Sequence, residues 1–171
     1  MKARLGRNWT LHATAIGEVS AAVAGLPRER YALILCSTHP DRIRRGASGA
    51  ENCLVMGFAD LTDEARPDTF HRDHAAFVAR YLSKLPPTVT ELYLCCDRGE
   101  SRAPAMLAAL LLAQGRSDRA VWRTPEYHPN PLVFRNLCLA LGLRMPPRCV
   151  KRRVRANERA FRRAVRRNAR R

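Results

Sequence analysis

The sequence lacks any apolar stretch long enough to cross a bilayer. Its longest purely apolar run, residues 105–113, is far shorter than the ~20 residues that a transmembrane helix needs. The basic N-terminus is followed by apolar residues that His12, Gly17 and Glu18 interrupt, so no secretory signal is predicted. An apolar fraction of 46% in 171 residues nevertheless indicates one globular domain.

The sequence also lacks the cysteine patterns of metal sites and secreted proteins. None of its six cysteines forms a C-x-x-C pair or has a histidine partner at zinc-finger spacing. We therefore expect no metal, no cofactor and no disulfide framework. Free thiols are typical of a reducing compartment, so we expect a cytoplasmic protein.

Acidic residues are scarce, and the imbalance is concentrated at one end of the chain. Residues 148–171 contain twelve Lys or Arg and the single acid Glu158, so they carry +11 of the formal net charge of +16. We expect a folded core domain over residues 1–147 and a basic tail over residues 148–171, with a proline-containing hinge at residues 144–148.

The tail combines apolar and basic residues in a pattern that allows an amphipathic helix or a disordered segment. Val150, Val154, Phe161 and Val165 fall near helical spacing, and arginines occupy the other faces. Such a segment attracts RNA, DNA or anionic lipid without sequence preference. The simpler alternative is a solvated tail that keeps the protein soluble.

The rest of the chain reads as an α/β domain with a central, mostly parallel sheet and helices on both faces. Short apolar runs predict buried strands, and helical periodicity with capping and terminating residues predicts helices. The predicted strands are residues 31–36, 53–58 and 91–95, and the predicted helices are residues 69–85, 103–114 and about 131–141. The last helix is expected to have Asn130 as its N-cap and Pro131 at its first position.

Between the last strand and the following helix lies the segment CDRGESR, residues 96–102, which fits C-x-x-G-x-x-R. Bare C-x5-R spacing is weak, because Cys36 with Arg42 and Cys138 with Arg144 also show it. Only the copy that starts at Cys96 has the glycine and the strand and helix on either side.

This context predicts a phosphate-binding loop. Successive backbone amides and a helix N-terminus form a positive concavity that holds a phosphoryl group and favours a thiolate at Cys96. Gly99 allows the backbone to turn inward, and the planar guanidinium of Arg102 can bind two phosphoryl oxygens. The predicted phosphate-binding residues are Asp97, Arg98, Gly99, Glu100, Ser101 and Arg102, with Cys96 as the nucleophile.

The loop resembles the HC-x5-R signature of protein tyrosine and dual-specificity phosphatases, most of all the bacterial tyrosine phosphatase-like type. The likeness runs from about Phe58 to Leu143 and includes a PN-x3-F pattern at Pro129, Asn130 and Phe134. It implies the cysteine-phosphatase fold and a metal-free hydrolase. The substrates would be phosphomonoesters, such as phosphotyrosine or phosphoserine/threonine of proteins, cleaved through a cysteinyl-phosphate.

Two residues depart from that family's pattern. Cys95 replaces the usual histidine, and Ala103 replaces the hydroxyl residue that assists thiolate departure. Hydrolysis of the phosphocysteine is then slow unless Ser101 or an ordered water substitutes. Two alternative functions stay open: an RNA 5′-phosphatase whose tail recruits nucleic acid, and a module that binds phosphate with weak or no turnover.

The family also places an aspartate upstream of the nucleophile as the general acid. Asp60 is favoured because the FxDL segment that contains it is similar to the family's FDD segment, and Asp63 is second. Asp68 is better explained as a helix cap. His71 and His74 are expected to be surface or capping residues, and no catalytic part is assigned to His128.

Overall fold

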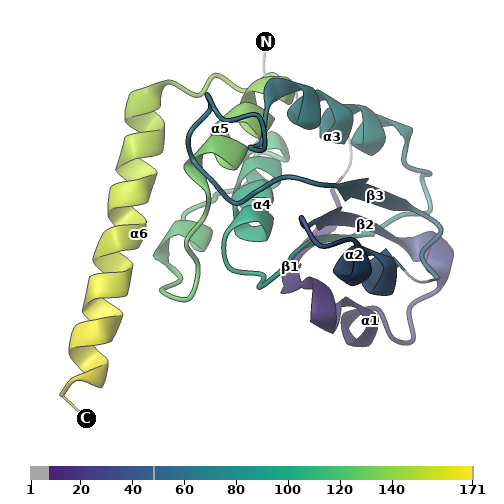
Figure 1. The fold of residues 1–171 in the computed structure, drawn as a ribbon, viewed down its shortest axis with the longest axis horizontal. Coiled ribbons are helices and arrows are strands. Elements are labelled where there is room, and N and C mark those ends of the chain that lie inside the picture. Colours follow the sequence, from purple (N-terminus) through teal and green to yellow (C-terminus); the bar gives the residue numbers. More distant parts are fainter. Residues whose placement is uncertain (1–7, 48, 171) are drawn as a thin grey trace.

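The computed structural model describes residues 8–47 and 49–170, which form a four-stranded, all-parallel sheet flanked by helices (Figure 1). The strand order is β1-β4-β2-β3, so the last strand in the sequence lies inside the sheet. The strands are β1 (Thr10–Ala15), β2 (Tyr31–Cys36), β3 (Cys53–Met56) and β4 (Glu91–Cys96).

All three predicted strands are confirmed, although the second ends two residues early at Met56. Every residue of β2 is buried, as expected for a central strand of a parallel sheet that is covered on both faces. The sequence did not predict β1. Its polar residues Thr10, His12 and Thr14 alternate with apolar ones, because β1 is an edge strand that pairs only with β4.

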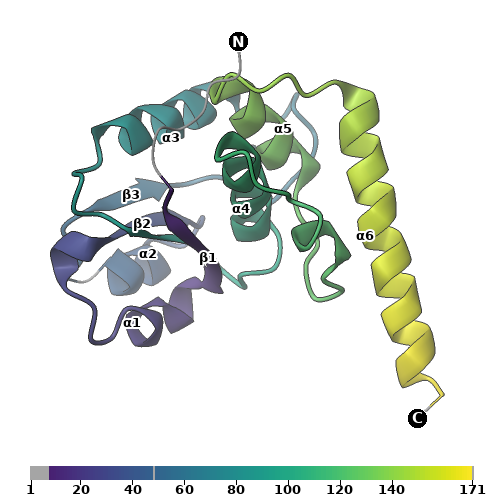
Figure 2. The same ribbon diagram turned by 180° about the vertical axis from the view of Figure 1, so that it is seen from behind.

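The helices are distributed over the two faces of the sheet (Figures 1 and 2). The short helices α1 and α2 cover one face, α3 and α4 cover the other, and α5 packs against α3 and α4. Their bounds are α1 (Val19–Ala22), α2 (Pro40–Ala47), α3 (Arg72–Lys84), α4 (Arg102–Ala113), α5 (Pro131–Ala140) and α6 (Pro147–Asn168), with 3-10 turns η1 (Ile16–Glu18), η2 (Arg28–Arg30) and η3 (Val121–Arg123).

The strand period of two sorts the central side chains between these faces. In β4, Leu92, Leu94 and Cys96 join the larger apolar core on the α4 side, whereas Tyr93 and Cys95 join the smaller core on the α1 and α2 side. Adjacent cysteines of this strand therefore project in opposite directions.

The expected N-terminal cap of the first long helix was wrong. Asp68 pairs with Arg66 through two contacts of 3.1 Å in the preceding turn, and α3 starts only at Arg72. The N-cap is His71, whose backbone N–H donates to Nδ1 of His74 at 3.0 Å. The histidines are thus capping residues, as expected, but the aspartate is not.

The other two predicted helices form with the expected ends. Helix α4 ends just before Gly115, and α5 is followed by Gly142; both glycines have positive φ. Asn130 caps α5, because its Oδ1 accepts the backbone N–H groups of Leu132 and Val133.

The basic C-terminal segment is a 22-residue helix, α6, and its first half is attached to the domain. The buried carboxylate of Asp118 accepts hydrogen bonds from Nε of Arg153 at 2.5 Å and from Nε1 of Trp122 at 3.0 Å. Asn157, also buried, donates to the carbonyl of Tyr127 at 2.8 Å. Further along, α6 extends beyond the body of the domain (Figures 1 and 2).

Over the described ranges, no helix is both long and apolar enough to span a bilayer.

Replacing Arg153 with Ala should loosen α6, because it leaves the buried Asp118 carboxylate without its cationic partner. We expect a loss of about 3 kcal/mol in the free energy of unfolding and faster hydrogen exchange in α6. Arg152→Ala, at the exposed neighbouring position, is the control and should change the free energy by about 0.5 kcal/mol or less. Equal losses in urea unfolding of the two variants would show that the ion pair does not hold the helix.

Candidate active site

The CDRGESR loop lies at the carboxyl end of β4, between the ends of β1 and β2. The segments that follow β1 and β2 pass to the face covered by α1 and α2, whereas α4 passes to the opposite face. A crevice opens at such a switch in open parallel sheets, and ligands bind there. The predicted loop therefore occupies the position where this fold class places its sites.

Gly99 gives the loop its sharp turn. Its φ is +71°, and its N–H donates to the carbonyl of Cys96 at 3.3 Å. A Cβ at this position would lie 2.7 Å from the backbone nitrogen of Ala15 and 2.8 Å from the carbonyl carbon of Thr14. The loop is thus pressed against the end of β1, and only glycine fits there.

Cys96 receives a backbone donor from the start of α4. Its Sγ accepts the N–H of Ala103 at 3.4 Å, and the residue is almost fully buried. Cys95 faces the other side of the sheet. The structure therefore distinguishes Cys96 as the thiol at a helix N-terminus.

Arg102 is a buried cation held by the loop and by its neighbours. Nη1 donates to the carbonyl of Phe58 at 2.9 Å, and Nη2 donates to Oδ2 of Asp97 at 2.5 Å. Nε is buried and has no hydrogen-bond partner in the described part of the chain; Oδ2 of Asp60 lies 3.9 Å away. An unsatisfied donor on a buried guanidinium is costly, and an anionic ligand would satisfy it.

The side chain of Asp97 points to the arginines. Oδ1 of Asp97 accepts a hydrogen bond from the hydroxyl of Ser37 at 2.5 Å, and Oδ2 accepts one from Nη2 of Arg102. Nη1 of Arg42 lies 3.4 Å from Oδ1. Burial alone would raise the pKa of Asp97, but the hydrogen bonds from Ser37 and Arg102 and the charges of Arg102 and Arg42 hold it below its usual value. Any contribution of this residue to phosphate binding therefore comes from its backbone amide.

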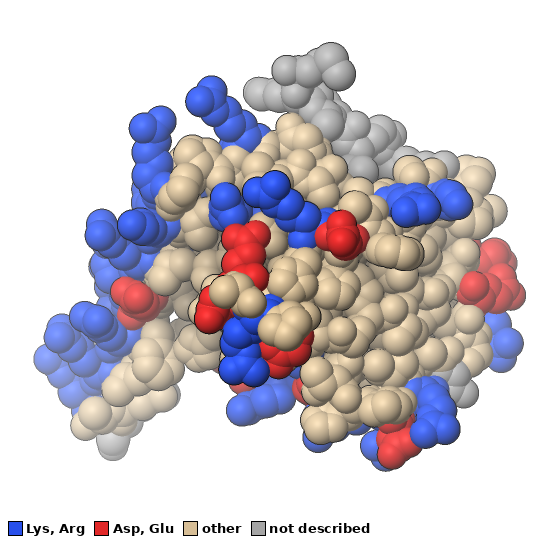
Figure 3. All heavy atoms as spheres, turned by 45° about the horizontal axis from the view of Figure 1, so that its top comes forward, with Lys and Arg blue, Asp and Glu red and all other residues tan. Residues whose placement is uncertain are grey.

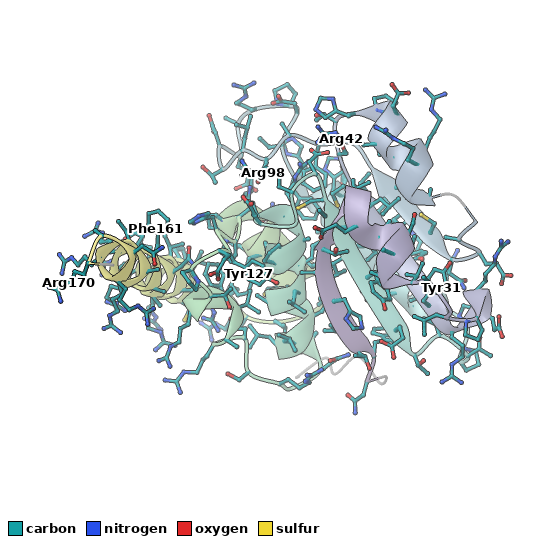
Figure 4. All side chains as sticks on the ribbon, turned by 90° about the horizontal axis from the view of Figure 1, so that it is seen from below. Tyr31, Arg42, Arg98, Tyr127, Phe161 and Arg170 are labelled. Carbon is teal, nitrogen blue, oxygen red and sulfur yellow. The ribbon has the colours of Figure 1, made fainter. Side chains whose placement is uncertain are left out.

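A hollow of about 580 Å³ lies beside Asp97. Arg42, Arg45 and Arg98 line it, together with residues of η1 and α1. Figure 4 shows Arg42 and Arg98 on the same side of the molecule. The rim of the loop is thus positive on the side of α2, which favours an anionic substrate.

Asp60 is the upstream carboxylate that the fold brings to the loop. Its Oδ1 accepts the hydroxyl of Ser101 at 2.9 Å and Nδ2 of Asn130 at 2.8 Å. Asp63 instead accepts a backbone N–H within its own turn, at Ala65. The geometry therefore favours Asp60 over Asp63 as the residue that faces the loop.

Three neighbours of the loop were not assigned to the site from the sequence. Asn130 was predicted as a helix cap. The cap uses only its Oδ1, so its Nδ2 is available to donate a hydrogen bond to Asp60. Ser37 binds Asp97 from the end of β2, and the backbone N–H of His128 donates to the carbonyl of Glu100 at 2.7 Å. A capping asparagine has a spare amide donor, so its pattern contained a usable signal; the other two contacts depend on tertiary placement.

Comparisons of the chain with protein families, curated proteins and solved structures found no match of any of the three kinds. The function must therefore be inferred from the site itself. Within the described ranges, no group of three or more histidines, cysteines and carboxylates is placed to hold a metal ion.

Gly99→Ala should destabilise the domain more than Gly115→Ala does. Both glycines have φ above +70°, but a Cβ at Gly115 meets nothing within 4 Å. The strain of positive φ, about 1–2 kcal/mol, is common to both variants, so the excess in Gly99→Ala measures the clash with β1, which we expect to add about 1–3 kcal/mol. Equal free energies of unfolding in urea would contradict the close approach of loop and strand.

Proposed function

We propose that this protein is a cysteine-dependent phosphatase that hydrolyses phosphomonoesters through a cysteinyl-phosphate, with the cysteine-phosphatase fold that its loop motif implies. One observation carries the proposal: a thiol at a helix N-terminus and a buried arginine, whose Nε has no hydrogen-bond partner among the described residues, lie at the two ends of one seven-residue loop. The motif resemblance, the switch-point position and the basic rim support it. The six unpaired cysteines are in keeping with the reducing, cytoplasmic location that we propose.

In the proposed reaction, the phosphoryl oxygens lie among the loop amides and Arg102. The thiolate of Cys96 attacks phosphorus, and the ester oxygen leaves with a proton from a general acid. Water then attacks the phosphocysteine, releases inorganic phosphate and restores the thiolate. Arg102 is held rigidly by Phe58 and Asp97, so little reorganisation is needed as charge develops on the phosphoryl oxygens.

Asp60 is the proposed general acid. Its Oδ1 accepts two hydrogen bonds, from Ser101 and Asn130, so a proton on this carboxyl group would reside on Oδ2. These two donors fix the orientation of the carboxyl group beside the loop. Asp60 would return the proton by acting as the base toward the attacking water.

A second candidate function is a phosphate-binding module with little turnover. Ala103 carries no hydroxyl, and the hydroxyl of Ser101 donates to Asp60. In this arrangement the donor to Sγ of Cys96 is the backbone N–H of Ala103. Departure of the thiolate then depends on backbone donors, which would slow the second step.

Cys96→Ser tests the proposal with a small aryl phosphate in the presence of a metal chelator. We expect turnover to fall by at least about 10³-fold, because the nucleophile is removed. Cys95→Ser is the matched control and should retain turnover, since Cys95 faces the opposite core. Retained activity in Cys96→Ser would contradict the mechanism. Absence of turnover in the unmodified protein, with phosphate bound in an Arg102-dependent way, would establish the binding module instead.

Asp60→Asn should slow the release of poor leaving groups much more than that of good ones. A positioned general acid contributes about 10²–10⁴-fold, and an alkyl phosphate needs it more than an activated aryl phosphate does. Asp63→Asn is the control, because that carboxylate is turned into its own loop. The same modest effect in both variants, or no dependence on the leaving group, would remove Asp60 from the mechanism.

A further inference from the structure

A continuous groove runs along one side of α6, away from the candidate active site. Three adjoining hollows of about 350, 460 and 780 Å³ form it, and all three are lined by Arg159. The middle hollow also shares Arg152 with one neighbour and Arg123 with the other. At 1.5 Å per residue, the 22 residues of α6 make this surface about 33 Å long.

In the two larger hollows, the wall opposite α6 is the segment around η3, which contributes Arg119, Arg123 and Pro125, whereas the smallest hollow is lined by α6 alone. The two walls are held together by the contacts of α6 with the domain. These are the pair of Arg153 with Asp118 and the hydrogen bonds that Asn157 donates to the carbonyls of Thr124 and Tyr127. The groove is therefore formed before any ligand binds, which lowers the entropic cost of binding.

The groove is strongly positive. Arg152, Arg159, Arg163 and Arg166 follow one another along α6 at helical spacing, Arg170 comes just after its end, and all are exposed. The carboxylate of Asp118, which also lines the groove, is already paired with Arg153. Figure 3 shows the basic side chains crowded along the edge formed by α6.

We propose that this groove binds the phosphate backbone of a nucleic acid strand. Arginines three and four residues apart repeat about every 5 Å along a helix axis, which suits a chain of regularly spaced phosphates. The guanidinium fork binds phosphate oxygens bidentately. The indole of Trp122 is buried, and Phe161 lies outside the groove, so no exposed aromatic ring lines it for base stacking. Recognition is thus of the backbone, without base preference.

A lipid bilayer fits this surface less well than a nucleic acid strand does. A membrane is flat, whereas the groove is concave between α6 and η3. A helix that lies in a membrane also needs a continuous apolar face. In α6 the first part of that face is used for docking, at Val150, and only Phe161 and Val165 remain exposed.

The test uses the full chain and labelled single-stranded RNA and DNA of about 15 nucleotides, with affinity followed by fluorescence anisotropy over a series of salt concentrations. Arg163→Glu places the change in the groove. Arg162→Glu, at the next position, lines none of the three hollows and is the control with the same change in net charge. We expect Arg163→Glu to weaken binding at least about fivefold and to lower the salt slope by about 0.7 or more, and Arg162→Glu to stay within about twofold of the unmodified protein.

Three results would overturn the proposal. Equal losses in the two variants would show general attraction to the tail and not binding in the groove. Tighter binding to vesicles that contain anionic lipid than to either oligonucleotide would assign the surface to membranes. A strong preference for RNA over DNA, or the reverse, would contradict recognition by phosphate alone. Turnover of a small aryl phosphate should be unchanged in both variants, so this test is independent of the proposed phosphatase activity.

Discussion

The parallel pairing of β4 with both β1 and β2 is the constraint on which the candidate site depends. It places Cys96 at the carboxyl edge of the sheet, with a strand end on each side. The chain must then leave the sheet on the face opposite to α1 and α2, and it does so through a turn in which Gly99 touches the backbone of β1. Strand, loop and helix N-terminus are thus one unit, and a thiol and a buried arginine are fixed at its two ends.

Charge within the site is balanced by a network that reaches four separate segments. Arg102 is held by Asp97 from the loop itself and by the carbonyl of Phe58 after β3, and Asp97 is in turn held by Ser37 after β2. Asp60 is oriented by Ser101 and by the cap of α5, Asn130. Because Arg102, Asp97 and Asp60 each have a hydrogen-bond partner on another element, the phosphate loop and the proposed acid keep their relative positions as long as the sheet and α5 stay packed.

In the basic helix α6, unlike in the candidate site, most charges are exposed to solvent, and only the contacts that attach the helix to the domain are buried. Asp118 in the domain and Asn157 in α6 are buried polar anchors, and each is satisfied by hydrogen bonds. This leaves most arginines free along one wall of a groove whose other wall belongs to the domain. The positive surface consequently has a defined concave shape. The same sequence in a disordered tail would attract anions by charge alone, without a preformed groove.

Local pattern was sufficient for the elements whose signals are contained in a few neighbouring residues. Residues 31–36 read as a strand because both faces are apolar, Asn130 and Pro131 marked the start of a helix, and the C-x-x-G-x-x-R spacing between strand and helix marked the loop. The edge strand β1, the order of the strands, the contact of Ser37 with Asp97 and the groove beside α6 were decided by tertiary structure alone. Each of these joins residues far apart in the chain, and their contacts arise only when apolar faces pack, so no short stretch of sequence contains them.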